Sequence, residues 1–234
     1  MRSRRGFTLL ELLLALGIFA VIASTVYAVF AGGIRLSRVS EGRVGVYREA
    51  GWAFALLARE LENMARFDTS GMKDGEPLFK GEQDEIAFLL PAEDGLKYVR
   101  YYLLAPSSGK IHEVVLGKRT SRNVEVDITS TAAQRSYFLV REEYGLLEAL
   151  AGTAEGAEPE IIAGNIKEAS FRLQYAYAEG ELGDTIRFKD SWDYGDIPAR
   201  VRVSMEFIDG YDAQAVPLSR EVLIPHGVLG KSES

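Results

Sequence analysis

The chain of 234 residues contains no cysteine, which excludes disulfide bonds, thiolate zinc sites and cysteine nucleophiles. Its only histidines, His112 and His226, are more than a hundred residues apart, and neither belongs to a metal-binding or catalytic motif. No glycine-rich loop opens a helix after a strand pattern, so nucleotide binding is unsupported. The sequence therefore predicts a protein that is not an enzyme and that uses no cofactor and no metal ion.

Basic residues are in the minority, because 27 lysines and arginines stand against 34 aspartates and glutamates, which gives a formal net charge of −7. Nucleic-acid-binding domains carry a basic surface that neutralises phosphates. We therefore expect no nucleic-acid partner.

One stretch near the start of the chain is free of charge altogether. From Leu12 to Ile34 there are 23 consecutive uncharged residues, and a helix of that length spans about 34 Å, enough to cross a bilayer. Glu11 stands at the start of this run, and a carboxylate in hydrocarbon is costly unless it is neutralised or paired. A plain membrane anchor explains the length of the run but not Glu11, which is therefore a candidate functional residue.

The residues before the run include arginines at positions 2, 4 and 5, followed by Gly6 and Phe7. A secretory signal has a shorter apolar core with a small-residue cleavage site after it, whereas here the small residue comes first. Conventional cleavage after Ala31 is an alternative, but it places the charged Glu11 inside the apolar core of the signal.

This stretch resembles the N-terminus of type IV prepilins and type II secretion pseudopilins, whose pattern is matched by Gly6, Phe7, Thr8, Leu9, Leu10 and Glu11. The resemblance implies that a prepilin peptidase cuts between Gly6 and Phe7 and methylates the new Phe7 amine. It also implies that Glu11 accepts the amine of a neighbouring subunit, which would make this acid a device for recruitment and register. The protein would then be a single-pass inner-membrane protein with its soluble domain in the periplasm.

Apolar residues continue beyond the uncharged run at helical spacing, at Val39, Val46, Ala50, Ala53, Phe54, Leu57, Leu61 and Met64. We therefore predict one helix from Phe7 to about Arg66, with this apolar stripe covered by a sheet. Charged residues are expected on the opposite, solvent-facing side of the helix, at Arg38, Arg48, Arg59, Glu60 and Glu62. The expected position of a bend is Gly32 and Gly33.

Short segments rich in β-branched or aromatic residues follow, separated by glycine, proline or serine, and they predict strands in antiparallel pairs. These segments are 85–90, 97–104, 111–116, 124–128, 137–142, 146–150, 169–178, 199–208 and 219–224. The expected fold class is α+β, a pilin-like long N-terminal helix, transmembrane in its first half and amphipathic in its second, packed on antiparallel β-sheet. The expected segments are a leader at 1–6, a transmembrane or filament-core helix at 7–34, an amphipathic spine helix at 35–66, a periplasmic sheet domain at 67–230 and a polar tail at 231–234.

Several later stretches resemble the J-type minor pseudopilin of type II secretion, namely 97–103, 138–142, 162–166 with 171–175, Trp192, and 197–201. Residues 111–131 fit this pattern least well. The resemblance implies a subunit of the pseudopilus tip, whose partners are prepilin peptidase, other minor pseudopilins, the major pseudopilin, the inner-membrane secretion platform and the inner membrane itself. Two alternatives stay open: a minor pilin of a type IV pilus, and a membrane-anchored periplasmic binding domain.

An acidic region surrounds Trp192 and Tyr194 and consists of Asp184, Asp190, Asp193, Asp196, Asp209 and Asp212. Carboxylates are calcium ligands, but the spacing matches no EF-hand loop, and solvated turn residues explain the acids as well. The two aromatic residues suit either an interface anchor or a cap on the core. The sequence leaves these alternatives open.

Overall fold

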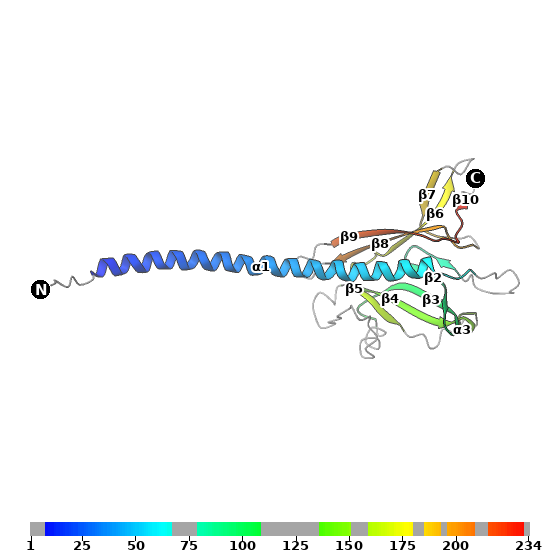
Figure 1. Ribbon diagram of the computed structural model, residues 1–234, viewed down its shortest axis with the longest axis horizontal. Helices are drawn as coiled ribbons and strands as arrows, with labels where there is room; N and C mark the ends of the chain where they lie inside the picture. The colour runs from blue at the N-terminus through cyan, green and yellow to red at the C-terminus, as the bar shows by residue number, and fades with distance from the viewer. Residues whose placement is uncertain are drawn as a thin grey trace. The chain divides into compact units, whose positions relative to one another are not determined.

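The computed structural model describes residues 8–66, 79–108, 136–150, 159–179, 185–192, 196–208 and 215–231. The chain divides into two compact units, Met1–Val44 and Gly45–Ser234. A long N-terminal apolar helix precedes an antiparallel β-sheet (Figure 1), so the predicted α+β, pilin-like fold class is confirmed. The strands predicted at 111–116 and 124–128 lie outside the described residues.

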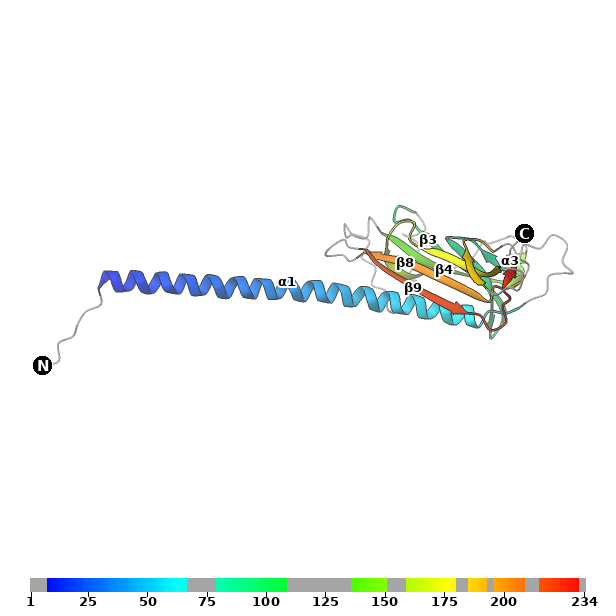
Figure 2. The same ribbon diagram turned by 90° about the horizontal axis from the view of Figure 1, so that it is seen from above.

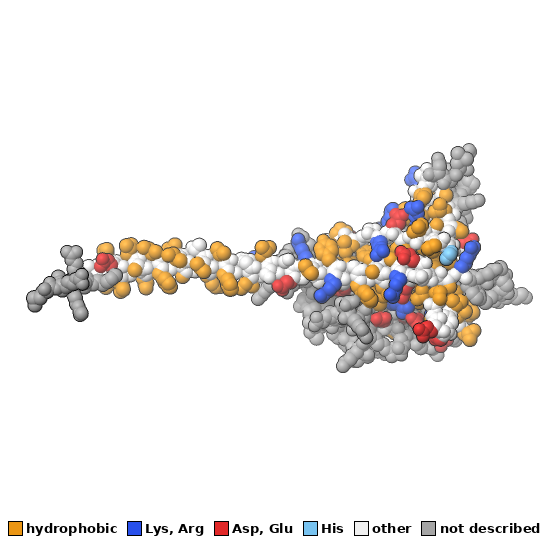
Figure 3. Space-filling view, in the orientation of Figure 1, with side chains coloured by type: hydrophobic (Ala, Val, Ile, Leu, Met, Phe, Trp, Pro, Cys, Tyr) orange, Lys and Arg blue, Asp and Glu red, His pale blue; other side chains and the backbone are white. Residues whose placement is uncertain are grey.

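The first unit is the N-terminal part of helix α1 (Leu9–Glu62). Its stretch Leu9–Ser37 is long and apolar enough to cross a membrane. Every described side chain in this unit is exposed, and hydrophobic side chains cover the visible surface of its first part (Figure 3). The helix is uninterrupted through Gly32 and Gly33, the expected position of a bend.

The second unit combines the end of α1 with the sheet, to which ten strands contribute among the described residues. The first five strands are β1 (Lys80–Gly81), β2 (Glu85–Ala92), β3 (Gly95–Leu104), β4 (Tyr137–Gly145) and β5 (Glu160–Ile166), and the short helix α3 (Leu146–Leu150) follows β4. The remaining strands are β6 (Arg172–Glu179), β7 (Thr185–Lys189), β8 (Arg200–Ile208), β9 (Ala215–Leu223) and β10 (Gly230–Lys231).

Strands β1 to β5 pair antiparallel in chain order. The connections from β1 to β2 and from β2 to β3 are of turn length, which favours this pairing, whereas the connections from β3 to β4 and from β4 to β5 are longer. The order then changes, because β5 lies beside β8 rather than β6. Strand β9 pairs with β8 along its whole length (Figure 2), and β6 pairs antiparallel with β8 and β7 and parallel with β10. The sheet therefore consists of an antiparallel meander, β1 to β5, followed by a C-terminal group of strands, β6 to β10, whose spatial order differs from the chain order.

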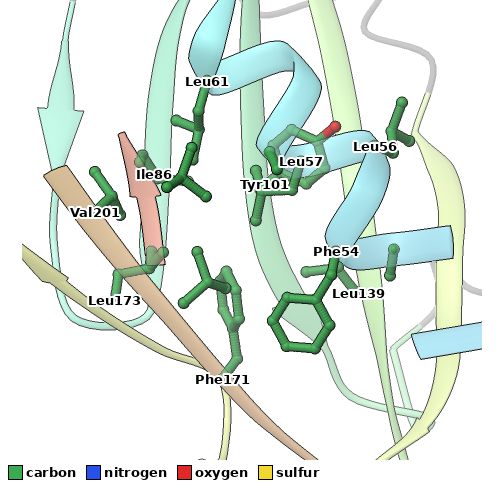
Figure 4. Packing of buried hydrophobic residues seen from close by; sticks show 14 of the residues in the cluster. Phe54, Leu56, Leu57, Leu61, Ile86, Tyr101, Leu139, Phe171, Leu173 and Val201 are labelled. Carbon is green, nitrogen blue, oxygen red and sulfur yellow. The ribbon is translucent and has the colours of Figure 1, made fainter. Parts of the chain in front are cut away.

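The core of this unit lies between the end of α1 and the sheet. Figure 4 shows Leu61 of the helix beside Ile86 of β2, and Phe54 beside Phe171, just before β6. Burying one large apolar side chain contributes about 1.5–3 kcal/mol, so the packed stripe accounts for why this part of the helix stays on the sheet. The members of the predicted stripe that are described and buried are Val46, Ala50, Ala53, Phe54, Leu57, Leu61 and Met64.

The prediction for Glu60 is wrong, because this acid faces the sheet and only 6% of it is exposed. Helical spacing alone places it next to the stripe, since residues three and four apart share a face and Leu57 and Met64 flank it. The charge of Glu60 predicted a solvent-exposed position, but a cationic side chain on the sheet pairs with it in the structure.

The strand predicted at 146–150 is also wrong, because these residues form α3. The sequence Leu-Leu-Glu-Ala-Leu consists of strong helix formers and has no β-branched residue. In addition, the Glu148 carboxylate accepts a hydrogen bond of 3.1 Å from the Gly145 amide, as in a helix cap. Four further strands, β1, β5, β7 and β10, were not predicted.

Candidate assembly site

The start of α1 is the first candidate site, and its described residues are Thr8 and Glu11. Gly6 and Phe7, the predicted cleavage and methylation positions, lie outside the described residues. The Thr8 amide and hydroxyl both donate to Glu11 Oε2, at 3.0 and 3.1 Å, and the Glu11 amide donates to Thr8 Oγ1 at 3.3 Å. This reciprocal arrangement is a capping box, which satisfies amide groups at the helix start.

The Glu11 carboxylate is exposed and has no cation beside it in its own helix. From Thr8 to Ile34 it is the only charged residue, and the next one is Arg35, about 36 Å further along the helix axis. The capping box holds the carboxylate at the start of the helix, where a positive group from outside the helix can approach it. The threonine-to-glutamate spacing of this capping box was present in the sequence but was not recognised there.

The Glu60 side chain forms an ionic cluster between α1 and the sheet. Arg141 Nε on β4 donates to both Glu60 carboxylate oxygens at 3.1 Å, and the Tyr101 hydroxyl on β3 donates to Oε2 at 2.7 Å. Burial, together with the Glu60 charge, raises the pKa of Tyr101 well above its usual value, so the phenol stays neutral. Burial lowers the Arg141 pKa, but the Glu60 charge outweighs this effect and the net direction is upward. The Tyr101 phenol and the Arg141 guanidinium therefore keep their protons near neutral pH, and the cluster ties α1 to the sheet.

A second acid on the same helix, Glu49, accepts a hydrogen bond from the Gly164 amide on β5. Here β4 and β5 are out of regular register, with shifts on both sides of Leu139. Burial raises the pKa of Glu49, although the Gly164 amide and the Arg48 charge partly offset this effect. Glu49 therefore satisfies a backbone group beside an irregular part of the sheet. Sequence reasoning missed both the buried Glu60 and the half-buried Glu49.

The acidic region is only partly described, and its described acids already have partners. Asp190 accepts a hydrogen bond of 3.0 Å from Gln174, and Asp196 forms an ion pair of 2.7 Å with Arg66. In the described ranges no group of three or more histidine, aspartate or glutamate side chains is arranged to hold a metal ion. The region's other members, Asp184, Asp193, Tyr194, Asp209 and Asp212, lie outside these ranges, as does His112, whereas His226 is exposed.

Trp192 belongs to the core, since only 5% of it is exposed. Its amide donates to the Gly81 carbonyl at 2.8 Å, and its indole donates to the Asp196 carbonyl at 2.5 Å. Of the two interpretations of Trp192, the structure supports a cap on the core rather than an exposed interface anchor.

Comparison with known families finds a prokaryotic N-terminal methylation motif at residues 1–27. No solved structure matches the chain. With the long apolar helix and the antiparallel sheet, the motif supports a type IV pilin-like or pseudopilin protein. It implies processing by a prepilin peptidase and assembly with other pilins, and the single apolar helix is compatible with single-pass anchoring in the inner membrane.

Proposed function

We propose that the protein is a minor pseudopilin of a type II secretion system. In this role it is a non-catalytic subunit of the periplasmic pseudopilus tip that helps to initiate assembly and to drive folded proteins across the outer membrane. The observation that carries the pilin-like class of this proposal is the methylation motif at residues 1–27, with Glu11 held at the start of an otherwise uncharged apolar run. Its partners are prepilin peptidase, other minor pseudopilins, the major pseudopilin and the inner-membrane secretion platform.

Three residues of the motif have separate roles in this proposal. Gly6 precedes the cleaved bond, where the absence of a side chain leaves room for the peptidase. Phe7 carries the methylated amine, and Glu11 accepts the amine of the neighbouring subunit. A wrong register would leave both charges unpaired in the membrane at a cost of several kcal/mol, so the pair selects one arrangement. The helix at 7–34 forms the membrane span and the filament core, and residues 35–66 form the spine of the soluble domain.

The size of the sheet supports a minor rather than a major subunit. A major pseudopilin needs only a small sheet, whereas ten strands are present in the described parts of this chain. The stretches similar to J-type subunits fall on β3, β4, β5, β6 and the start of β8. This pattern favours the tip subunit.

A minor pilin of a type IV pilus is the second candidate, because the same motif precedes both kinds of subunit. Deletion of the gene in its host separates the two. Loss of a secreted enzyme from the medium with unchanged motility and DNA uptake supports the secretion system, and the reverse result supports the pilus.

The first experiment is the intact mass of the protein purified from its host membranes, with fragmentation of the N-terminus. We expect a chain that begins with N-methylated Phe7. The control variant Gly6→Leu should retain Met1, because its side chain obstructs cleavage. A wild-type chain that retains Met1, or one that begins after Ala31, would contradict the proposal.

A further inference from the structure

A hollow of about 610 Å³ opens on the sheet, where the turn between β5 and β6 meets β8 and β9. Its lining includes a row of three register partners, Arg172 on β6, Ser204 on β8 and Ser219 on β9. Their neighbours along β6 and β8, Leu173 and Val203, are buried in the core against α1. Because successive side chains of a strand point to opposite faces, the row lies on the sheet face away from the helix.

The other charged groups that line the hollow already have partners. Lys167 forms an ion pair of 2.7 Å with Glu206, and the Glu168 carboxylate accepts a hydrogen bond of 2.7 Å from the Tyr137 hydroxyl. By contrast, Arg172 is exposed, and its side chain forms no ion pair or hydrogen bond with any described residue. Among the described residues, the hollow therefore presents one guanidinium whose donors are available to a ligand.

Arg172 differs from the other arginines on the same face of the sheet. Two more arginines lie on the same face of β8, Arg200 and Arg202, and both pair with Glu221 of β9, at 3.1 and 3.5 Å. Arg202 also stacks on the Phe188 ring, 3.8 Å from its centroid. Within the part of this face that the structure describes, Arg172 thus differs from Arg200 and Arg202, because no carboxylate pairs with it. Arg172 also lines the hollow.

The rim of the hollow is formed by a well-held turn. Ala169 has a φ of +53°, a left-handed conformation that costs a residue with a side chain about 1–2 kcal/mol. The neighbouring Ser170 hydroxyl holds the turn, since it donates to the Lys167 carbonyl at 2.7 Å and accepts from the Glu206 amide at 3.1 Å. The hollow is therefore formed before any ligand arrives, as is usual for binding sites.

We propose that this hollow binds an extended peptide segment of a partner protein through an acidic side chain, whose carboxylate pairs with Arg172. A guanidinium matches a carboxylate in two parallel hydrogen bonds, and the Ser204 and Ser219 hydroxyls lie beside it. The volume is in the range of sites for small ligands, so the hollow accommodates a few residues rather than a folded domain. The inference does not depend on which secretion or pilus system the protein serves.

The test uses the absence of cysteine, because a single introduced cysteine can be labelled selectively. Full-length Pro217→Cys protein in detergent carries an environment-sensitive fluorophore at the edge of the hollow. The probe is an acetylated and amidated hexapeptide of alternating glutamate and valine, compared with the same peptide containing glutamine. We expect saturable binding, with the glutamate peptide bound at least about fivefold more tightly at low salt, a preference that weakens at high salt.

Two variants locate the preference. Arg172→Gln should bring the two dissociation constants within about twofold of each other, since the charged hydrogen bonds are lost. Arg220→Gln is the matched control and should leave the preference unchanged, because Arg220 of β9 is exposed but pairs in register with the buried Val203 and so lies on the other sheet face. Arg172 is at the surface, and an unchanged urea midpoint would confirm that the variant is folded.

Four outcomes would overturn the proposal. They are equal binding of the two peptides by the wild-type protein, the absence of saturable binding, a glutamate preference that survives in Arg172→Gln, and an equal response from a label at Leu223→Cys. Leu223 is exposed at the far end of β9 and pairs with Arg200, so a response there would place the peptide outside the hollow.

Discussion

Glu49 and Glu60 are acids on the face of α1 that packs against the sheet, and they are eleven residues apart, about three helical turns. Their surroundings differ. Glu60 meets the Arg141 guanidinium and the Tyr101 hydroxyl, whereas Glu49 accepts one backbone amide hydrogen bond from β5. We therefore expect the charge of Glu60 to stabilise the folded state and the charge of Glu49 to destabilise it.

Replacing Glu60 tests the first case. Glu60→Gln removes the charge that balances Arg141 at a site where both side chains are largely buried. Breaking a buried ion pair costs about 3–5 kcal/mol, and we expect the low end because Arg141 keeps a second partner, Glu143, at 2.9 Å. Urea unfolding of the full chain in detergent measures the loss. Glu62→Gln, on the exposed side of the same helix, should change stability by less than about 0.5 kcal/mol, and equal effects of the two changes would refute the role of the pair.

Replacing Glu49 should stabilise the protein instead of destabilising it, and the size of this effect should depend on pH. Burial raises the pKa of Glu49 above the usual value of 4.5, so the folded state binds its proton more tightly than the unfolded chain does. The stability that the folded state gains from binding this proton is complete below about pH 4.5 and is lost as pH rises through the folded-state pKa of Glu49. Glu49→Gln keeps an oxygen that accepts the Gly164 amide but cannot ionise. The variant should therefore be more stable than wild type at pH 7, and this advantage should vanish near pH 4.

Urea midpoints of both proteins from pH 4 to pH 8 measure this difference. Glu62→Gln controls for a general change in net charge. A Glu49→Gln variant that is less stable than wild type at pH 7 would show that the carboxylate is stabilising where it lies.

At the scale of elements, two glycines predict opposite effects of the same substitution. A Cβ at Gly81 of β1 would lie 2.7 Å from the Tyr175 ring and 2.9 Å from Trp192, whereas one at Gly51 of α1 would meet nothing within 4 Å. Gly81→Ala should therefore destabilise the protein by about 1–3 kcal/mol through overpacking. Gly51→Ala should stabilise it by about 1 kcal/mol through helix propensity. Thermal or urea unfolding of the two variants checks both signs, and a neutral Gly81→Ala would mean that β1 can move away from Trp192.

The helix and several strands could be predicted because their patterns are strong and local. The apolar spacing from Val46 to Met64 identified the face that is buried, and alternation identified β8. Edges and charges were harder to predict. Strand β9 begins at Ala215, before the predicted residue 219, because Pro217 is tolerated in a strand at the edge of the sheet.

Features that depend on distant partners could not be predicted from the sequence. The Glu60 interaction needs Arg141, 81 residues away, and the Glu49 interaction needs Gly164, 115 residues away. The predicted strand at 169–178 began too early because Ala169 adopts a left-handed conformation that Ser170 holds in place. By contrast, the capping box of Thr8 and Glu11 is local, and its spacing was sufficient to predict it.

At the scale of the whole molecule, folding and assembly should depend on different residues. In the structure Glu11 interacts with Thr8 of its own helix start and lies in the first unit, Met1–Val44, whereas the core lies in the second. A change at Glu11 therefore removes no contact of the core, and the urea midpoint of the soluble unit should be unchanged. The same change removes the only charge in the apolar run, which the proposed assembly step requires.

Glu11→Leu separates these two roles. We expect a chain that is still cleaved before Phe7, still methylated and still in the membrane, but reduced at least about tenfold in sheared pseudopilus fractions, because an unpaired amine in the membrane costs more than 1.4 kcal/mol. Thr8→Val is the matched control: it removes the hydroxyl of the capping box but keeps the carboxylate, and it should cost at most about 1–2 kcal/mol of helix capping. If Glu11→Leu protein entered the pseudopilus as well as wild type, Glu11 would be a helix cap alone, and the membrane-anchored binding domain would become the better interpretation.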